Sequence, residues 1–459
     1  MSKLIASSHL TAIVGMGVTG ISVARFLSRE NKNFIMFDTR QEPENLQAFI
    51  QEFPDVPYVL GDLSDESLMN VNEIILSPGL DIKEPVLQKA IERGVSIVGD
   101  IQLFINAIDK PLIAITGSNA KTTVTTLVGE MIAAAGKKVK VGGNIGVPAL
   151  DLLGDPEEET DFFVLELSSF QLETIRKTNA EVATILNLSA DHMDRYAGLA
   201  EYHKAKQRIY FGAKKIVLNR DDPLTQPPIA ANVKITSFGL SAPDIGHFGL
   251  IEESGTTYIA FGLKKLMPVG ELKIVGKHNY ENALAALAVV WSLGLEIEPA
   301  LQVLRSFIGL PHRCQLVASV NGVVFINDSK GTNVGATLAA IEGLSSSNSR
   351  LVLIAGGEGK DANFKPLIPV FKEHVAALIS IGRDASLLED IAQQAGVVSQ
   401  RADNLEQAVS LAYASCGKND TVLLSPACAS FDMFKNYLDR GEKFIAAVND
   451  LVQQGGPLQ

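Results

Sequence analysis

The feature that most constrains the fold is a repeated alternation between short apolar runs and segments of helical periodicity. The first runs are TAIVG, NFIMFD, EIILSPG and VSIVGD, and each is closed by Gly, Asp or Pro. Strands of a parallel sheet are continuous apolar runs of this kind, because helices cover both faces of the sheet. The alternation therefore predicts an α/β fold built on mostly parallel sheets.

The alternation divides into three units, as expected for 459 residues, which exceed one ordinary hydrophobic core. We predict domains at residues 1–106, 107–310 and 311–459. The second unit opens with KPLIAITG and continues with DFFVLELS, VATILNLS and KKIVLN. The third contains VVFINDS, RLVLIAGG, ALISIG and TVLLSP, and it follows a predicted hinge in SFIGLPHRCQ, which holds Gly309 and Pro311.

Composition indicates a globular protein, with 46% hydrophobic and 20% charged residues. The formal net charge of −12 disfavours nucleic acid and anionic membranes as partners, so an anionic ligand requires a local basic pocket. The three cysteines lack metal-ligand spacing and are typical of free thiols in a reducing cytosol. The longest apolar stretch, residues 283–295, is too short to span a bilayer. We expect a cytoplasmic protein without membrane insertion.

The stretch IAITGSNAKTT, residues 113–123, resembles a phosphate-binding loop but lacks its glycines. The template G-x-x-x-x-G-K-[ST] requires glycine where this chain has Ile115 and Ala120. If residue 120 is left-handed, alanine costs about 1–2 kcal/mol. One charge-assisted hydrogen bond to a phosphate offsets about 1.5–3 kcal/mol. The loop can therefore tolerate the substitution.

The residues around this loop favour phosphate binding. Gly117 supplies a flexible turn, and Lys121 and Thr122 begin a segment of helical periodicity that Gly136 can end. The N–H groups at a helix N-terminus attract phosphate, and the Thr122 hydroxyl can hold Mg²⁺. An ordinary strand-to-helix turn is the alternative interpretation.

Three side chains downstream each have a functional and a structural interpretation. Glu166 ends the run FFVLE, where a phosphate-loop domain places a magnesium-organising acid, although a strand-end carboxylate is commonly solvated. His192 in SADHMDRY can be a ligand or a structural histidine. Lys206 is aligned with Tyr202 and Tyr210 at helical spacing, and composition alone favours a surface lysine.

A second glycine motif, GMGVTG at residues 15–20, lies between the strand TAIV and the helical segment ISVARFL. Asp38 ends the next strand, near the distance at which an acid binds ribose in a dinucleotide site. This pattern makes an NAD(P)-dependent oxidoreductase the rival hypothesis. The donors of Thr39 and Arg40 suit a different nucleotide equally well.

Taken together, the motifs resemble the ATP-dependent Mur ligases. The resemblance rests first on ITGSNAKTT, GGNIG, LELSSFQLE, ADHMDRY, AKQRIY and HNYENALAA. GMGVTG with DTR, NDSKGTN, GGEGKDANF and LLSPACASFDMFKNYLDRGE make the chain similar to the members that add D-glutamate to UDP-N-acetylmuramoyl-L-alanine. The resemblance covers essentially the whole chain. It implies a Rossmann-like N-terminal UDP-binding domain, a central P-loop ATPase domain and a C-terminal Rossmann-like α/β domain that binds the amino acid.

The resemblance also implies roles for individual residues. The UDP substrate is expected to contact Val18, Thr19, Asp38, Thr39, Arg40, Ser77, Pro78, Gly79, Asn144, Ser168, Gln171 and His192. ATP is expected at Gly117, Asn119, Lys121, Thr122, Thr123, Asn279, Asn282, Arg313, Asp328 and Lys330. Magnesium is expected at Thr122, Glu166, His192 and Lys206, the last as a carbamate. The catalytic set is Lys121, Glu166, His192, Lys206 and Arg313.

D-Glutamate is expected at Thr332, Lys360, Ser430 and Tyr437, where the family usually has phenylalanine instead of the tyrosine. Local physics alone permits blander roles. The segment 77–79 can be a simple turn, Asn279 a helix cap, Arg313 a surface ion pair and Lys360 a solvated loop charge. Ser430 can likewise cap a helix that begins at FDMFKNYL.

The implied reaction is a step of peptidoglycan precursor synthesis carried out by a cytoplasmic monomer. ATP phosphorylates the substrate carboxylate, and the amine of D-glutamate displaces phosphate from the acyl phosphate. A nucleotide-dependent switch without enzymatic activity is the third hypothesis. It leaves the nucleotide pocket of the first domain without a use, and the oxidoreductase leaves Lys121, Lys330 and Lys360 unexplained.

Overall fold

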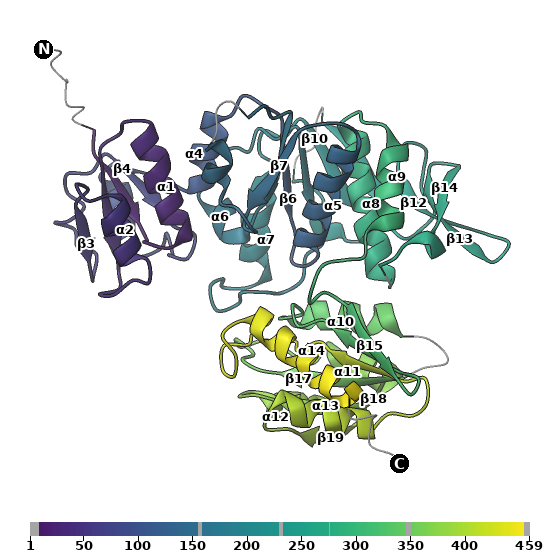
Figure 1. Ribbon diagram of the computed structural model, residues 1–459. Coiled ribbons are helices and arrows are strands. Elements are labelled where there is room, and N and C mark those ends of the chain that lie inside the picture. The colour runs from purple at the N-terminus through teal and green to yellow at the C-terminus, as the bar shows by residue number, and fades with distance from the viewer. Residues whose placement is uncertain (1–8, 155–157, 229–232, 275, 346–349, 454–459) are drawn as a thin grey trace, which may run out of the picture.

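The apolar runs form parallel strands in three separate sheets of the computed structural model (Figure 1). The structure describes residues 9–154, 158–228, 233–274, 276–345 and 350–453. Every run expected as a strand contains strand residues. The predicted three-part α/β organisation with mostly parallel sheets is therefore confirmed.

The N-terminal sheet has the strand order β3-β2-β1-β4-β5, and all its pairings are parallel. Its strands are β1 (Thr11–Val14), β2 (Phe34–Asp38), β3 (Tyr58–Leu60), β4 (Glu73–Leu76) and β5 (Ser96–Val98). Its helices are α1 (Val18–Arg29), α2 (Leu46–Glu52) and α3 (Pro85–Glu92). The chain reverses its direction across the sheet beside β1, so the GMGVTG loop lies at the switch point where such sheets bind ligands.

The central sheet is also parallel and has the order β11-β10-β9-β6-β8-β7. Its strands are β6 (Leu112–Thr116), β7 (Val139–Gly143), β8 (Phe162–Glu166), β9 (Val182–Ile185), β10 (Lys215–Asn219) and β11 (Lys234–Phe238). The α-helices after Gly99 and before the hinge are α4 (Asp100–Ala107), α5 (Lys121–Ala134), α6 (Ser169–Glu173), α7 (Leu199–Gln207), α8 (Lys277–Ser292) and α9 (Ile297–Ser306). The 3₁₀ turns are η1 (Ala149–Leu153), η2 (Arg208–Tyr210), η3 (Pro223–Thr225) and η4 (Val269–Glu271).

A small antiparallel sheet, which the sequence did not indicate, follows the central one. It consists of β12 (Phe248–Glu253), β13 (Thr256–Phe261) and β14 (Lys264–Pro268). Phe248 and Ile259 from this sheet are buried in the same core cluster as α5 and α8. The small sheet thus extends the core that supports the phosphate-loop helix.

The C-terminal sheet has the order β15-β16-β20-β17-β18-β19 and is parallel except for the edge strand β15. Its strands are β15 (Gln315–Val320), β16 (Val323–Asn327), β17 (Leu351–Gly356), β18 (Val375–Ile381), β19 (Val398–Arg401) and β20 (Thr421–Leu424). Its helices are α10 (Val334–Leu344), α11 (Leu367–His374), α12 (Ala385–Ala395), α13 (Leu405–Ala414) and α14 (Tyr437–Gln453).

Helix α8 packs against α5 in the core, and this packing fixes the position of the phosphate loop that precedes α5. Residues 283–290 of α8 are 0–1% exposed, so this helix is apolar all round and lies inside the core. Val124, Leu127 and Val128 of α5 are also fully buried in that cluster. As predicted, Gly136 follows the end of α5 with a left-handed φ of 76°.

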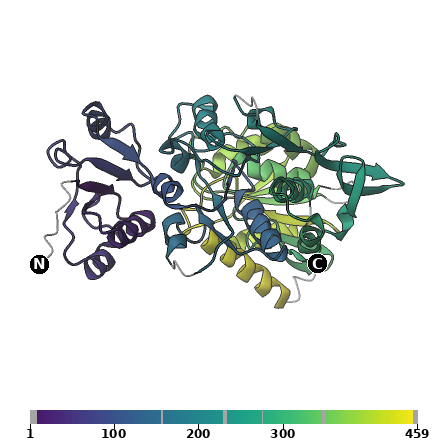
Figure 2. The same ribbon diagram turned by 90° about the horizontal axis from the view of Figure 1, so that it is seen from above.

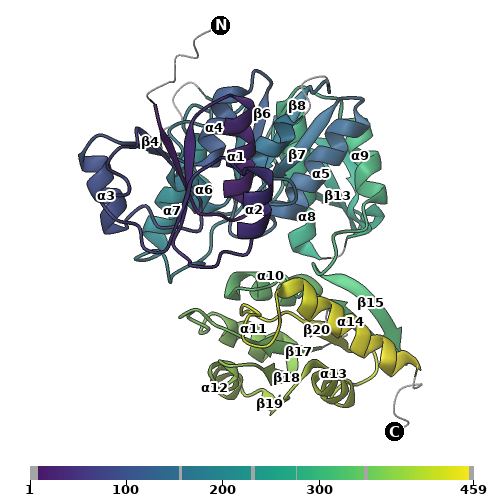
Figure 3. The same cartoon turned by 60° about the vertical axis from the view of Figure 1, so that its left-hand side comes forward.

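The C-terminal domain lies beneath the central domain (Figures 1 and 3), and the N-terminal domain lies beside the central domain (Figure 1). Seen from above, the C-terminal domain overlaps the central one while the N-terminal domain extends away from both (Figure 2). The helix α4 contacts the central domain, since the rings of Phe104 and Phe163 meet at 5.1 Å. The predicted boundaries at residues 106 and 310 remain predictions.

Among the helices that the structure describes, none has the length and apolar character needed to cross a membrane. Cys314, Cys416 and Cys428 are free thiols.

The glycines of GMGVTG have different structural roles, and this difference can be tested. A Cβ at Gly20 would lie 1.8 Å from the Gly15 carbonyl oxygen, whereas one at Gly17 would meet no atom within 4 Å beyond its chain neighbours. We expect Gly20→Ala to lower the free energy of unfolding of the N-terminal domain by about 1–3 kcal/mol, the usual cost of overpacking. Hydrogen exchange in β1 and α1 measures this change. Gly17→Ala is the matched control, and equal effects of the two variants would contradict the assignment.

Candidate active site

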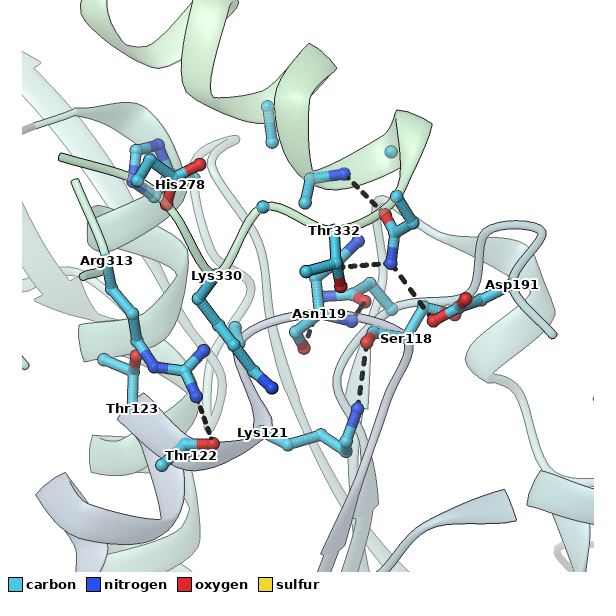
Figure 4. A pocket seen from close by; sticks show the side chains of 18 of the residues that line it. Ser118, Asn119, Lys121, Thr122, Thr123, Asp191, His278, Arg313, Lys330 and Thr332 are labelled. Carbon is cyan, nitrogen blue, oxygen red and sulfur yellow. Dashed lines mark hydrogen bonds between the residues drawn. The ribbon is translucent and has the colours of Figure 1, made fainter. Parts of the chain in front are cut away.

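A cleft of about 1200 Å³ is lined by residues of both the central and the C-terminal domain (Figure 4). Most of the residues predicted from the sequence to bind ATP, metal or amino acid line it, together with Asn144, Ser168 and His192 of the set predicted for the UDP substrate. These are Asn119, Lys121, Thr122, Thr123, Asn144, Glu166, Ser168, His192, Lys206, Asn279, Asn282, Arg313, Asp328, Lys330, Thr332, Lys360, Ser430 and Tyr437. The fold thus brings together side chains that lie far apart in the sequence.

Two predicted residues support the wall of the cleft without lining it. The Gly117 carbonyl oxygen accepts hydrogen bonds from Lys121 Nζ at 3.0 Å and Lys206 Nζ at 2.8 Å. Gln171 forms a capping box with Ser168, because each backbone N–H donates to the other's side chain at 3.1 Å. The capping box fixes the start of α6, directly after β8.

The phosphate loop has the backbone that its template requires, despite the missing glycine. Ala120 has a φ of 64°, in the left-handed region, and immediately precedes α5. Alanine in this conformation costs about 1–2 kcal/mol. Lys121 Nζ folds back over the loop and donates to Gly117 O and to Ser118 O at 2.9 Å.

Cations from three parts of the chain converge on this loop. Lys330 and Arg313 extend toward the start of α5, where Lys121 lies (Figure 4), and Arg313 Nη2 donates to Thr122 Oγ1 at 2.5 Å. Burial lowers the pKa of all three side chains. For Lys330 the pKa falls to about 8, and repulsion from Arg313 and Lys121 adds to the effect of burial. The surface ion pair considered for Arg313 is therefore wrong.

Lys206 is buried, so its interpretation as a surface lysine is wrong. Its side chain is 1% exposed, and Nζ contacts Gly117 O at 2.8 Å and Thr116 Oγ1 at 3.2 Å. The ammonium also lies 4.9 Å from the centre of the Tyr202 ring. Burial, followed by repulsion from Lys121, lowers the pKa of Lys206 well below its usual value. The neutral, nucleophilic amine is favoured as a result.

Glu166 is poised to bind a cation. Its Oε1 accepts a hydrogen bond from Asn144 Nδ2 at 2.8 Å, but its buried Oε2 has no hydrogen-bond partner. A buried carboxylate oxygen without a partner is costly unless a ligand or metal satisfies it. Within the described part of the chain, no cluster of three or more His, Cys, Asp or Glu side chains can hold a metal. Other donors must therefore complete any metal site at Glu166.

His192 also lines the cleft and has a strained backbone, with a φ of 56°. Its ring packs 4.7 Å from that of Phe170, and its Nε2 lies 3.7 Å from Asp191 Oδ2. Burial lowers the pKa of His192, which favours the neutral imidazole that can bind a metal.

A pair of asparagines and an aspartate line the cleft at the helix α8 and at the end of β16. Asn282 Nδ2 donates to Asn279 Oδ1 at 3.0 Å. Asn279 is not a helix cap, because Gly276 occupies that position. Asp328 accepts hydrogen bonds from Ser425 Oγ at 2.8 Å and from the Cys314 N–H at 3.2 Å, and burial raises its pKa to about 6.

The residues predicted for D-glutamate gather on the C-terminal side of the cleft. Lys360 has a left-handed φ of 51°, and its Nζ lies 6.0 Å from the Phe431 ring centre. The helix expected to start at Phe431 begins instead at Tyr437, since residues 431–436 form turns. Ser430 therefore does not cap that helix. The Tyr437 ring lies 4.0 Å from Lys330 Nζ, and tyrosine keeps the cation–π contact that phenylalanine can make.

The N-terminal-domain residues predicted for the UDP substrate do not line this cleft. Val18, Thr19, Asp38, Thr39, Arg40, Ser77, Pro78 and Gly79 belong to the N-terminal domain, around the switch point of its sheet. Val18 is 68% exposed, which leaves the start of α1 open to a ligand. The Ser77 hydroxyl donates to Gly15 O at 3.1 Å, so the segment 77–79 adjoins the glycine loop rather than forming an isolated turn.

Asp38 does not have the free carboxylate that a dinucleotide site requires. It is buried, and it accepts a hydrogen bond from the Met16 N–H at 2.7 Å. Arg40 Nε and Nη2 bind its two oxygens at 2.9 and 2.8 Å. The carboxylate therefore holds the glycine loop and Arg40 in place, and its capacity for ribose hydroxyls is already used.

The sequence reasoning missed two polar side chains that connect domains. Arg195 Nη2 donates to Glu173 Oε2 at 2.6 Å and to Leu80 O at 3.0 Å, which joins the central domain to the segment after Gly79. Asn333 donates to residues of two central-domain loops. Both lie inside motifs that were recognised, ADHMDRY and NDSKGTN, but only the fold shows their partners.

Sequence families and relatives agree with this architecture. The Mur ligase middle domain matches residues 115–290, the MurD-like N-terminal domain matches 9–99 and the glutamate ligase domain of Mur ligases matches 312–428. UDP-N-acetylmuramoylalanine–D-glutamate ligases from Pseudomonas fluorescens (strain Pf0-1) and Pseudomonas aeruginosa are each 52% identical to the chain. Both alignments cover 98% of this chain and 100% of the relative.

Solved structures share the fold at low sequence identity. UDP-N-acetylmuramate–alanine ligase MurC from Thermotoga maritima has a TM-score of 0.59 at 20% identity, over 96% of this chain and 99% of that one. The MurF ligase of the same organism, in complex with ADP, has a TM-score of 0.59 at 16% identity, over 99% and 100%. The matched domains and the full-length relatives show that this chain belongs to the Mur ligase family.

Proposed function

We propose that this protein joins D-glutamate to UDP-N-acetylmuramoyl-L-alanine at the expense of ATP, as a cytoplasmic monomer in peptidoglycan precursor synthesis. The names of relatives about half identical over the whole chain support this specificity. The observation that carries the proposal is the convergence of Lys121, Arg313 and Lys330 on one phosphate loop between two domains. This cluster of positive charge suits a bound polyphosphate. Because the cluster lies between two domains, a reacting group can approach the polyphosphate from the other domain.

The proposed reaction has two balanced steps. The carboxylate of the L-alanyl substrate attacks the γ-phosphorus of ATP, forming an acyl phosphate and releasing ADP. The amine of D-glutamate then attacks the acyl carbon, a proton leaves the nitrogen, and the C–O bond breaks to release phosphate. Lys121, Arg313 and Lys330 would stabilise the charge that develops on the phosphoryl oxygens. Asn279, Asn282 and Asp328 would hold the nucleoside.

The N-terminal domain would hold the UDP end of the substrate. Its exposed loop around Val18 and Thr19 lies at the switch point of a parallel sheet, where backbone N–H groups can approach a diphosphate. The Asp38 carboxylate would fix Arg40, which is 56% exposed and can face the nucleotide. Asn144, Ser168, Gln171 and His192 of the central domain are proposed for the muramoyl end.

Magnesium fits the donors of the cleft. Thr122, Glu166 and His192 offer a hydroxyl, an unpartnered carboxylate oxygen and a neutral imidazole. Lys206 would contribute as a carbamate, which converts a cation into an oxygen donor. When bound, the ion would supply charge neutralisation at the phosphates. Thr122 lies in the first turn of α5, directly after the loop, so this set adjoins the proposed phosphate position.

The C-terminal side of the cleft would receive D-glutamate. Lys360 supplies a cation for a carboxylate, and Thr332 and Ser430 supply hydroxyl donors. Tyr437 packs against Lys330 and so joins the amino-acid side to the nucleotide side. The oxidoreductase alternative is disfavoured because Asp38 is already paired.

The function predicts a specific requirement for three substrates. We expect the purified protein to release phosphate from ATP only when UDP-N-acetylmuramoyl-L-alanine and D-glutamate are both present. L-Glutamate and D-alanine should support little release. A coupled phosphate assay measures this, and absorbance at the reduced-nicotinamide band tests for the oxidoreductase in the same preparation.

The variant Lys121→Ala tests whether the phosphate loop holds the reacting phosphates. Loss of one preorganised donor should lower kcat by about 10²–10³-fold. Circular dichroism confirms that the variant is folded. Near-normal turnover of a folded variant would show that the loop does not hold the reacting phosphates.

The carbamate at Lys206 predicts dependence on carbon dioxide. We expect the enzyme to incorporate isotopically labelled bicarbonate at one lysine, because the lowered pKa of Lys206 favours the neutral amine. Native mass spectrometry and peptide mapping locate the label, and Lys206→Arg should not take it up. A bare amine throughout in the active, magnesium-supported enzyme would exclude this role.

The pKa of Lys330, about 8, predicts that ATP affinity depends on pH. Above that pH the free enzyme loses the Lys330 proton, and a bound polyanion should restore it. Binding therefore takes up a proton, and affinity should fall by up to about tenfold per pH unit between pH 8 and 10. Calorimetry in buffers of different ionisation enthalpy measures the uptake. Lys330→Arg, charged throughout this range, should flatten the profile, and an unchanged profile in that variant would assign it to another group.

A further inference from the structure

Asn333 connects the C-terminal domain to two loops of the central domain. Its Nδ2 donates to Asn119 Oδ1 at 3.2 Å and to Asp191 Oδ2 at 3.1 Å. Asn119 belongs to the phosphate loop, and Asp191 immediately precedes His192. In Figure 4 the segment that carries Thr332 adjoins Asn119, with Asp191 beyond it. One amide thus contacts both loops that border the proposed reaction centre.

Every polar atom of this amide is used. Asn333 Oδ1 accepts a hydrogen bond from the Ala336 N–H at 2.8 Å and so caps α10. The two hydrogens of Nδ2 remain for the two central-domain oxygens, and the residue is 9% exposed. An aspartate can cap the helix equally well but has no hydrogen to donate. Helix capping and interdomain contact are therefore separable by substitution.

The first turn of α10 lies directly on the central domain. A Cβ at Gly335 would lie 2.5 Å from Ser189 Oγ and 3.4 Å from Asn119 Nδ2. Because hydrogen bonds weaken steeply beyond about 3.5 Å, the contacts of Asn333 persist only while the two domains are docked. These hydrogen bonds therefore stabilise the closed arrangement, in which the two domains are docked.

We propose that Asn333 is a positioning residue that couples the D-glutamate side of the cleft to the phosphate loop. Thr332, which is proposed to bind D-glutamate, directly precedes Asn333 in the chain. Binding of the amino acid to Thr332 therefore also restricts the position of Asn333. The amide then fixes Asn119 and Asp191 in the closed state. This inference rests on the proposed ligase function.

The test compares two variants that both keep a capping oxygen. Asn333→Asp places a carboxylate opposite Asp191, whereas Asn333→Ser is neutral and removes the donors. We expect Asn333→Asp to lower kcat/KM for D-glutamate by about 10- to 150-fold, the range for hydrogen bonds to charged groups. Asn333→Ser should give a smaller loss. ATP affinity measured without D-glutamate should fall by a smaller factor than kcat/KM for D-glutamate, because the central-domain contacts to ATP remain when the domains are apart; a general loss of structure would not produce this difference.

A double variant provides a rescue. Combining Asn333→Asp with Asp191→Asn reverses the direction of the hydrogen bond and removes the repulsion, so it should be more active than Asn333→Asp alone. Small-angle scattering with ATP and Mg²⁺ should show a less compact molecule for Asn333→Asp than for the unaltered chain. Unaltered kcat/KM in both single variants of an active enzyme would overturn the coupling. If the unaltered chain has no ligase activity, the proposed function fails, and equal compactness of the two proteins would overturn the coupling separately.

Discussion

The site depends on keeping several basic side chains beside one another at the phosphate loop, away from bulk water in whole or in part. Lys206 is buried, Lys121, Lys330 and Arg313 are partly buried, and burial lowers the pKa of each. Neutral hydrogen-bond acceptors, such as Gly117 O and Thr122 Oγ1, offset part of the free-energy cost of desolvation. The remaining compensation comes from carboxylates, of which Glu166 acts on all four. A site with this excess of positive charge is stabilised by a bound polyanion, in a chain whose net charge is −12.

This charge excess also bears on the arrangement of the domains. Lys121 and Lys206 belong to the central domain, whereas Arg313 and Lys330 follow the hinge. Their mutual repulsion opposes docking of the C-terminal domain, while the Arg313–Thr122 and Asn333–Asp191 hydrogen bonds favour it. An anionic ligand between the domains would remove the repulsion and leave the hydrogen bonds. Closure that follows nucleotide binding is the expected consequence, because the ligand interacts differently with the two arrangements.

The sequence predicted the central parallel strands well, because strands covered on both faces are uniformly apolar. It did not indicate the edge strands β3 and β19, whose residues are largely exposed, or the sheet β12–β14. The predicted start of α14 was wrong. Ser430 can cap a helix only if the backbone that follows it is helical, and residues 431–436 form turns instead. The surroundings of Lys206 and Asn333 depend on contacts distant in sequence, so local composition could not reveal them. The family resemblance located Lys206, but only the fold gave Asn333 its partners.

Ala120 shows what a glycine template represents. Residue 120 has a left-handed φ although it is alanine and not glycine, the residue that usually permits this conformation. The required property is therefore the direction of the N–H groups at the start of α5, and glycine is the least costly way to obtain it. A penalty of about 1–2 kcal/mol is small beside the stabilisation of a helix packed against the fully buried α8. Backbone geometry imposed by tertiary packing can thus preserve a phosphate site that its sequence pattern no longer specifies.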